Sequence, residues 1–395
     1  MPAIATRSGT IGVAKPRTKT AARAAAKAAV KPIRWSDPAG LLMTTTGVLV
    51  LVGLVMILSA SLWNSESSPF LYFNKQALWA ALGLIAFFFF ARFDYKRLKG
   101  LGYVLLPIVV GLLLVVLIPG IGTNVGGSSR WFRLGPLSFQ PSEAAKLALI
   151  LFAADVFSRK KEKMFKHFSH AAVPMIPVLG VLSALVMLQP DLGTTALLGF
   201  IGMGMLFVAG ARVRHMLPFA LAGTTLAVGA ALFEPYRRAR VLAFLNPWAD
   251  PLNTGYHTIQ SLIALGSGGW FGVGLGASRQ KWTYVPNAHT DFIFAILGEE
   301  MGLLGTLVIV GLFSFLAYLG ITTARRAPDR FGMLVAAGIT IWITLQALVN
   351  MGAVTAALPV TGVPLPLVSF GGTSLVICLT AMGILTNIAR QGRSA

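Results

Sequence analysis

The chain has 395 residues, of which 55% are hydrophobic and only 12% are charged, and its mean hydropathy is +0.74. Soluble domains carry about a quarter charged residues, so this composition excludes a water-soluble globular protein and places most of the chain in lipid. A single cysteine, Cys378, excludes a disulfide framework or a thiolate metal cluster within the monomer. The net charge of +20 would indicate nucleic acid in a soluble protein; here it is a signal of membrane topology, and no nucleic-acid partner is expected.

The chain begins with a basic tail, residues 1–39, that lacks the apolar core and cleavage site of a secretory signal. We expect this tail to be disordered and cytoplasmic. Four of its basic residues are spaced by four and on a helix would form one stripe able to touch an anionic membrane leaflet. They are Lys19, Arg23, Lys27 and Lys31.

Ten apolar runs follow the tail: 41–60, 73–91, 101–118, 144–157, 171–188, 192–210, 216–233, 292–322, 331–355 and 374–388. Most are long enough to cross about 30 Å of hydrocarbon as a helix. Because a backbone in lipid must satisfy its own hydrogen bonds, runs this evenly apolar predict helices rather than barrel strands. The predicted fold class is therefore all-α, a polytopic transmembrane bundle of about ten helices over residues 40–390.

Two of the runs are unusual in length. The run 144–157 is short unless its helix begins at Pro141, because proline fits the first turn of a helix. The run 292–322 is longer than the bilayer requires, so its helix must tilt, bend or protrude.

Most of the 33 lysine and arginine residues lie on one side of the predicted spans. They fall in the tail and in residues 92–99, 159–166, 212–214, 325–330 and 390–393. The positive-inside rule assigns this side to the cytoplasm, so both termini, including the short end 391–395, are expected inside the cell. The long loop 234–290 then lies outside, and its interrupted stretch 255–276 predicts an interfacial or re-entrant helix rather than a span.

Ionisable side chains inside membrane segments are costly and by default mark function. Glu143 and Lys146 share one helix face at i, i+3, and the alternative to a functional site is a structural ion pair inside the bundle. Asp191 follows a proline between two runs, and its alternative role is a helix cap. Glu299 and Glu300 cannot share a face, so we expect at least one of them to bond a neighbouring helix or backbone.

Asp291 begins the long run 292–322 from the outer side. One interpretation is a helix cap. The other is a carboxylate at the boundary between water and lipid that takes a proton, while cations of the outer loops bind an anionic lipid headgroup. The candidate substrate-binding residues on this side, with Arg130 and Lys281 as the first cations to test, are Arg130, Lys281, Gln260, Ser261 and His289.

The polar residues above lie in motifs that follow one another along the chain. They are Arg130-Trp131, Pro141-Ser142-Glu143 with Lys146, Gln189-Pro190-Asp191-Leu192-Gly193, His289-Thr290-Asp291-Phe292-Ile293-Phe294, Gly298-Glu299-Glu300 and Pro364-Leu365-Pro366-Leu367-Val368-Ser369-Phe370-Gly371-Gly372. In this order they resemble the SEDS family (shape, elongation, division and sporulation), over residues 40–390. The basic N-terminal extension and residues 362–366 look more like the division branch of the family than the elongation branch, and Phe370 does not decide between them.

The resemblance implies a peptidoglycan glycosyltransferase that polymerises lipid II into a growing lipid-linked glycan strand outside the bacterial cytoplasmic membrane. Asp291 matches the family's essential carboxylate, and Glu143, Lys146 and Asp191 match positions that line its central cavity. The implied partners are a class B penicillin-binding protein and other membrane proteins of the division machinery. No cofactor is evident; arginine, lysine or a divalent cation, Mg²⁺ or Mn²⁺, would offset the charge that develops on the pyrophosphate leaving group.

Two rival functions stay open on the sequence alone. Bundles with broken helices and buried charges also serve as transporters or lipid flippases, but those place charges near the bilayer centre in two similar halves. No repeat is visible here, and most of the unusual charges are predicted near the outer face. The second rival is a non-enzymatic scaffold that recruits a transpeptidase.

Overall fold

The protein is described by a computed structural model over residues 37–61, 70–125, 128–135, 137–160, 168–233, 235–281 and 289–392. The basic stripe at Lys19, Arg23, Lys27 and Lys31 and the end 393–395 lie outside the described residues. The expectations for these two segments stay predictions.

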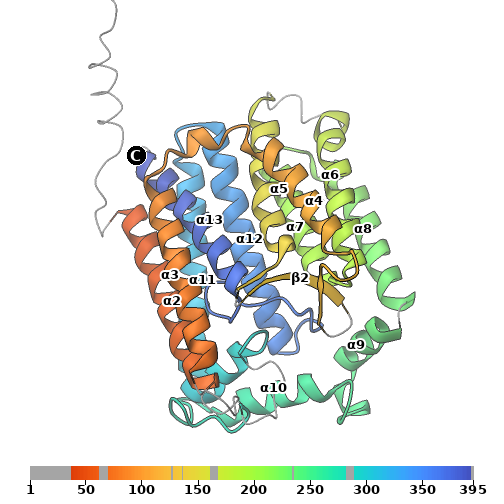
Figure 1. The fold of residues 1–395 in the computed structure, drawn as a ribbon, viewed down its shortest axis with the longest axis vertical. Coiled ribbons are helices and arrows are strands. Elements are labelled where there is room, and N and C mark those ends of the chain that lie inside the picture. Colours follow the sequence, from red (N-terminus) through yellow and green to blue (C-terminus); the bar gives the residue numbers. More distant parts are fainter. Residues whose placement is uncertain are drawn as a thin grey trace, which may run out of the picture.

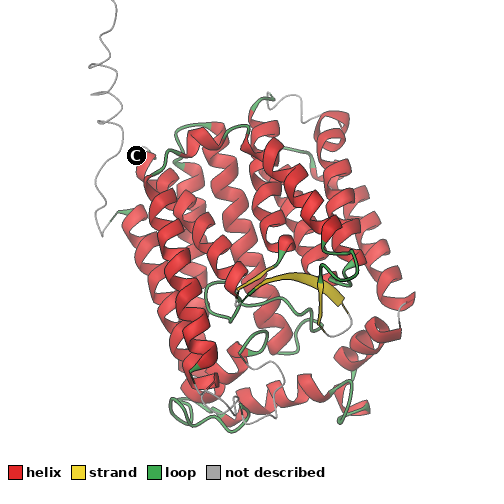
Figure 2. Ribbon diagram, viewed as in Figure 1, coloured by secondary structure: helices red, strands yellow, loops and turns green. Residues whose placement is uncertain are grey.

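Helices make up most of the described chain (Figures 1 and 2). The bundle is built from α2 (Pro38–Ser61), α3 (Leu71–Arg92), α4 (Leu101–Val115), α5 (Pro141–Ser158), α6 (Phe168–Leu188), α7 (Leu192–Val208), α8 (Val213–Phe233), α11 (Ile293–Arg325), α12 (Arg330–Val354) and α13 (Gly372–Gln391). Five of these, α2, α3, α11, α12 and α13, are long and apolar enough to cross a membrane by length and composition. Each predicted apolar run coincides with one helix. The helix of the short run 144–157, α5, begins at Pro141, as the length of that run required. The helical fold class is confirmed.

α12 places polar side chains in the interior of the bundle. It packs against α5, α7 and α11. Trp342, Gln346 and Asn350 on this helix are all buried, and because they are four residues apart they lie along one face. This face carries the polar network described below.

A small antiparallel sheet, which the sequence analysis did not predict, connects α4 to α5. It consists of β1 (Thr123–Val125), β2 (Ser128–Leu134) and β3 (Leu137–Phe139) in the order β1-β2-β3. α4 has only 15 residues, so the chain that follows it is non-helical at membrane depth. Such a backbone needs protein partners for its hydrogen bonds. The strands supply these partners to one another, and β2 holds Arg130 in a strand rather than in a flexible turn.

The long helix α11 reverses direction at Gly302, where φ is +68° and ψ is −167°. A Cβ placed on Gly298 would lie 3.2 Å from Cγ2 of Thr306. Residues eight apart on a straight helix are separated by about 12 Å, so the two parts of α11 fold against each other. Residues 293–301, named here the short arm, therefore run back into the protein, and only residues 303–325 are needed to cross the bilayer. Of the three alternatives that the length of this run left open, tilt, bend or protrusion, the structure shows the bend.

Loop residues after α10 (Tyr256–Ser267) replace the helical hydrogen bonds lost at this reversal. The N–H groups of Val273 and Gly274 donate to the carbonyls of Glu299 and Glu300, at 3.0 and 3.1 Å. In the other direction, the N–H groups of Leu303 and Leu304 donate to the carbonyls of Gly269 and Trp270, at 2.9 and 3.2 Å. The break in α11 is thus satisfied by protein, as burial requires.

The outer loop forms a layer across one end of the bundle. α9 (Pro235–Leu245) and α10 lie at the end opposite the C-terminus, and α10 runs across the bundle (Figure 1). With 12 residues α10 is too short to span about 30 Å of hydrocarbon. It is the helix that the stretch 255–276 predicted.

Candidate functional site

Asp291 immediately precedes the short arm and is partly buried. Its main-chain carbonyl accepts a hydrogen bond of 2.8 Å from Nδ2 of Asn350 on α12. The same nitrogen donates to the carbonyl of Val363, also at 2.8 Å. Phe292, not Asp291, occupies the N-cap position of α11. Asp291 is therefore tied through its backbone to α12 and to the chain ahead of α13.

The carboxylate of Asp291 faces residues 361–364, named here the 361–364 segment. Gly362 has a φ of +72°, and a Cβ placed on it would lie 3.7 Å from Oδ2 of Asp291. Glycine thus places no side chain between the segment and the carboxylate. Among the described residues, the buried hydroxyl of Thr361 and the buried Oδ1 of Asn350 have no hydrogen-bond partner.

The 361–364 segment also contacts the start of α7. A Cβ placed on Gly193 would lie 2.6 Å from the carbonyl oxygen of Thr361, so the two backbones touch. Just ahead, Asp191 accepts hydrogen bonds from the N–H and the hydroxyl of Thr194, at 3.0 and 2.9 Å. The helix-cap interpretation of Asp191 is confirmed, and its turn abuts the segment that faces Asp291.

Arg130 fixes the turn that leads to Asp191. Its guanidinium donates to the carbonyls of Gln189 and Pro190, at 2.7 and 2.6 Å, and lies 3.9 Å from Oδ2 of Asp191. The Arg130 side chain keeps 28% of its surface exposed. Arg130 is thus linked through the turn at Asp191 and the start of α7 to the 361–364 segment, which lies next to Asp291.

Glu143 and Lys146 form a buried ion pair on α5, with 2.8 Å between Oε1 and Nζ. Nζ of Lys146 also donates to Oε1 of Gln346 (2.9 Å) and lies 5.1 Å from the centre of the Trp342 ring. The amide of Gln346 in turn donates to the carbonyl of Pro364 at 3.0 Å. The predicted pairing is confirmed, and the pair is linked through α12 to the same 361–364 segment.

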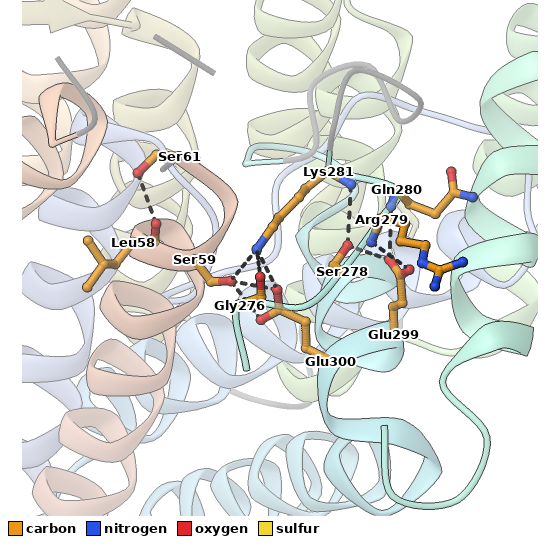
Figure 3. Close-up of polar contacts among 10 residues, drawn as sticks. All are labelled: Leu58, Ser59, Ser61, Gly276, Ser278, Arg279, Gln280, Lys281, Glu299 and Glu300. Carbon is orange, nitrogen blue, oxygen red and sulfur yellow. Dashed lines mark hydrogen bonds and ion pairs between the residues drawn. The ribbon is translucent and has the colours of Figure 1, made fainter. Parts of the chain in front are cut away.

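Lys281 forms a second buried ion pair, with Glu300 at the end of the short arm (Figure 3). The distance is 3.2 Å, and neither side chain has exposed surface. Lys281 also donates to the carbonyl of Gly276 (2.6 Å), and Glu300 accepts from the hydroxyl of Ser59 on α2 at 2.6 and 2.8 Å. In this geometry the ammonium of Lys281 does not reach solvent. Its contact with substrate stays a prediction.

Glu299 points to the loop on the other side of the arm (Figure 3). Its carboxylate accepts hydrogen bonds from the hydroxyl of Ser278 and from the N–H groups of Arg279 and Gln280, at 3.0 and 3.4 Å for the latter two. Both glutamates therefore bond neighbouring elements, as their adjacency predicted. Together they attach the short arm to α2 and to the outer loop.

Three predicted site residues remain: Ser261 and Gln260 on α10, and His289 shortly before α11. Ser261 is buried and donates to the carbonyl of Val354 (2.6 Å), while Gln260 is partly buried. His289 packs its ring against Tyr72 and Phe370, at 4.6 and 5.5 Å between ring centres. Burial lowers the pKa of His289 below its ordinary value. Substrate contacts of these three residues stay predictions.

Sequence reasoning missed Gln346 and Asn350, the two amides that connect the site. Both lie in the apolar run 331–355, where only ionisable residues had been considered. A usable signal was present, because two amides four residues apart in a lipid-embedded helix must find partners inside the protein.

The described residues contain no group of three or more His, Cys, Asp or Glu side chains placed to hold a metal ion. The carboxylate of Asp291 lies next to Gly362 in the 361–364 segment. Magnesium ions are commonly held by one or two carboxylates together with substrate phosphates. A divalent cation would therefore fit this donor set only together with a phosphate-bearing substrate.

Residues 39–394 match a family model described as a cell cycle protein and named for FtsW, RodA and SpoVE. Stage V sporulation protein E of Bacillus subtilis is 44% identical over 361 residues, which cover 91% of this chain and 98% of that protein. A probable peptidoglycan glycosyltransferase FtsW of Legionella pneumophila is 41% identical over 354 residues, with 87% of this chain and 89% of that protein covered.

Two solved structures share the fold. One is a chain from a peptidoglycan synthase complex studied for the coordination of polymerization and crosslinking; it is 32% identical with a TM-score of 0.72, covering 90% of this chain and 98% of that one. The other is the rod shape determining protein RodA of Thermus thermophilus, 28% identical with a TM-score of 0.66, covering 92% and 98%. Both similarities extend over nearly the whole helical bundle.

Proposed function

Because the chain belongs to the FtsW, RodA and SpoVE family and is a peptidoglycan glycosyltransferase, we propose that Asp291 is the general base of its polymerisation reaction. The supporting observation is the setting of this carboxylate. Asp291 is held through its backbone by Asn350, and its Oδ2 faces the side of Gly362 that carries no side chain. A reacting hydroxyl can approach a carboxylate placed in this way.

The reaction joins two lipid-linked disaccharides. A hydroxyl oxygen of the acceptor sugar forms a bond to the anomeric carbon of the donor, the bond from that carbon to the lipid pyrophosphate breaks, and the hydroxyl proton passes to Asp291. Pyrophosphate leaves without an acid. A carboxylate takes the proton as the new bond forms, because the hydroxyl becomes more acidic while its oxygen bonds to carbon.

The negative charge that develops on pyrophosphate needs a positive partner. We assign this role to Arg130, whose guanidinium keeps exposed surface beside Asp191, or to a divalent cation, Mg²⁺ or Mn²⁺. Asp291 together with the substrate pyrophosphate would hold such a cation. Glu143 and Lys146 are proposed to bind substrate from the interior side of the same segment.

We place this chemistry at the outer face of the bacterial cytoplasmic membrane, with both termini in the cytoplasm. The start of α2 and the C-terminus lie at one end of the bundle and α10 at the other, in agreement with the positive-inside rule (Figure 1). The proposed partner is a class B penicillin-binding protein, alongside other division membrane proteins. A similar chain comes from a complex that combines polymerization with crosslinking.

A role in cell division, rather than elongation, is proposed from the degree of similarity. Relatives named FtsW are about 40% identical to this chain, whereas the solved RodA structure is 28% identical. The relative named for stage V sporulation is 44% identical, so a role in sporulation is the alternative to test beside division.

The test is polymer formation by purified protein from lipid II. Asp291→Asn keeps the shape of the side chain but removes the base, so we expect polymer yield to fall by at least about 10³-fold, within the range for loss of a general base. The matched control is Asp250→Asn, a partly buried aspartate of the same predicted outer loop whose carboxylate accepts hydrogen bonds from Asn253 and Thr254. Normal polymer from Asp291→Asn would refute the base role, and translocation without polymer in sealed vesicles would favour the flippase.

A further inference from the structure

Asn350 is a buried amide that takes no direct part in the reaction described above. It lies on α12 with 2% of its surface exposed. Its Nδ2 donates to two carbonyls, those of Asp291 and Val363, both at 2.8 Å. These two carbonyls belong to the two stretches of chain that face each other at the carboxylate of Asp291.

The orientation of this amide is fixed by its partners. Both are carbonyl oxygens, which only accept hydrogen bonds, so the nitrogen and not the oxygen of the Asn350 amide must face them. Buried carbonyls need donors, and the side chain supplies both of its hydrogens here. A single amide therefore sets the spacing between the Asp291 backbone and the 361–364 segment.

Gln346, one helical turn earlier on α12, shows what is particular to Asn350. Its amide nitrogen donates to the next carbonyl of the same segment, that of Pro364, at 3.0 Å. Its oxygen accepts from Lys146 and Trp342. Both amides hold the segment, but of the two only Asn350 has a hydrogen bond to Asp291.

We propose that Asn350 is a positioning residue for the glycosyl transfer, which holds the base at a fixed place relative to Gly362. This inference rests on the proposed role of Asp291. Because a displacement of about 1 Å in a catalytic group can lower a rate by about 10²-fold, loss of the amide moves the base without removing it. The effect falls on turnover rather than on substrate binding.

The experiment compares Asn350→Leu with Asn387→Leu in the full-length protein. Asn387 is also a buried asparagine, at the opposite end of the bundle, where it donates to the carbonyl of Ala91 (3.0 Å) and accepts from the N–H of Tyr95 (3.1 Å) and from the side-chain amide of Gln391 (3.0 Å). Each substitution replaces a hydrogen-bonded buried amide with an apolar side chain of similar size. Because Asn387→Leu breaks one hydrogen bond more, it should lose at least as much thermal stability as Asn350→Leu.

The measured quantities are kcat and KM for polymer formation from lipid II, and the thermal midpoint. We expect Asn350→Leu to lower kcat by about 30- to 100-fold with KM within about threefold of wild type, and Asn387→Leu to keep kcat within about twofold. If Asn350→Leu does not fold, Asn350→Ser is measured instead. Serine adds no bulk and keeps one short donor, so we expect a smaller loss in kcat, of about tenfold.

Three outcomes would overturn the positioning role. They are a wild-type kcat in the Asn350 variant, a kcat loss equal to that of Asn387→Leu at equal stability, and a raised KM with unchanged kcat. A failure of the general-base assignment is seen separately, because in that case Asp291→Asn itself retains polymer formation.

Discussion

Two buried lysine–glutamate pairs occur among the described residues of the bundle, and they differ in how completely their polar atoms are bonded. In the pair of Lys281 with Glu300, the lysine donates to Glu300, to Ser59 and to the carbonyl of Gly276, and both carboxylate oxygens accept from Ser59. In the pair of Lys146 with Glu143, Oε2 of Glu143 has no partner among the described residues. The hydroxyl of Ser142 beside it is equally unbonded within that part of the chain.

This difference distinguishes a pair whose acceptors are all bonded from a pair that retains an unbonded acceptor. A buried ion pair is tolerated when its remaining hydrogen-bonding atoms are satisfied, whereas a buried acceptor left without a donor costs about 1–3 kcal/mol. The Lys281 pair meets this condition and joins the short arm to α2. The Lys146 pair does not, and it is connected through Gln346 to the segment that faces Asp291. We therefore interpret the first as a clamp and the second as part of the substrate site.

The first test of the difference between the two pairs removes the cation of the clamp, Lys281. Lys281→Met leaves Glu300 buried without its counter-charge, so we expect the free energy of unfolding to fall by about 3–5 kcal/mol. The measurement is unfolding in mixed detergent micelles. The double variant Lys281→Met with Glu300→Gln removes both charges and should recover most of the loss, because the amide oxygen introduced in place of the carboxylate would still accept from Ser59.

Equal stability of Lys281→Met and wild type would show that the pair is not the clamp the structure indicates. A double variant as unstable as the single one would point to lost packing rather than to the stranded charge.

A second test, with a smaller expected change in stability, uses two matched serines, one beside each lysine–glutamate pair. Ser59→Ala removes a hydroxyl bonded to Glu300, so we expect a loss of about 1–3 kcal/mol in the free energy of unfolding and little change in KM. Ser142→Ala removes a buried hydroxyl that has no partner among the described residues, so we expect unchanged or slightly higher stability. If this hydroxyl binds substrate, its loss raises KM for lipid II by about 2- to 12-fold.

Both serines are buried next to a lysine–glutamate pair, which makes each the control for the other. The interpretation fails if Ser142→Ala destabilises the protein as much as Ser59→Ala, or if the KM change appears in the Ser59 variant instead.

The helical bundle could be predicted from the sequence because a backbone in lipid must satisfy its own hydrogen bonds. Each run of apolar residues therefore corresponds to one helix. The sequence was also sufficient for pairings set by local geometry. Glu143 and Lys146 pair at i, i+3, and Asp191 caps the helix that follows it. These features depend on residues that are close in sequence.

The parts that could not be predicted depend on contacts between distant residues. The reversal of α11 at Gly302 requires backbone partners from the loop after α10, and no local pattern announces such a loop. The ion pair of Lys281 with Glu300 was not predicted, because Ser59 and Glu300 lie on two other elements. Asn350 was passed over since its role appears only when Asp291 and Val363 are brought to the same amide.

The smallest expected effect concerns His289, a third polar group without a full set of partners. Its Nδ1 is buried and has no hydrogen-bond partner among the described residues, and burial lowers the pKa of the ring. The unfolded chain titrates near pH 6.5, so above that value the histidine is neutral in both states and adds no pH dependence. Below about pH 6.5 the unfolded state binds a proton that the folded state does not, and stability falls until the lower folded pKa is reached.

His289→Phe isolates this term, because phenylalanine keeps the ring contacts with Tyr72 and Phe370 but does not titrate. We expect the wild type to lose stability relative to the variant as the pH falls below about 6.5, by no more than about 1.4 kcal/mol per pH unit for one proton. Taking the difference between the two proteins cancels every other titrating group. If the difference in the free energy of unfolding between the two proteins stays constant from pH 8 to pH 5, His289 is protonated as easily in the folded protein as in the unfolded chain. That result would contradict the lowered pKa of His289.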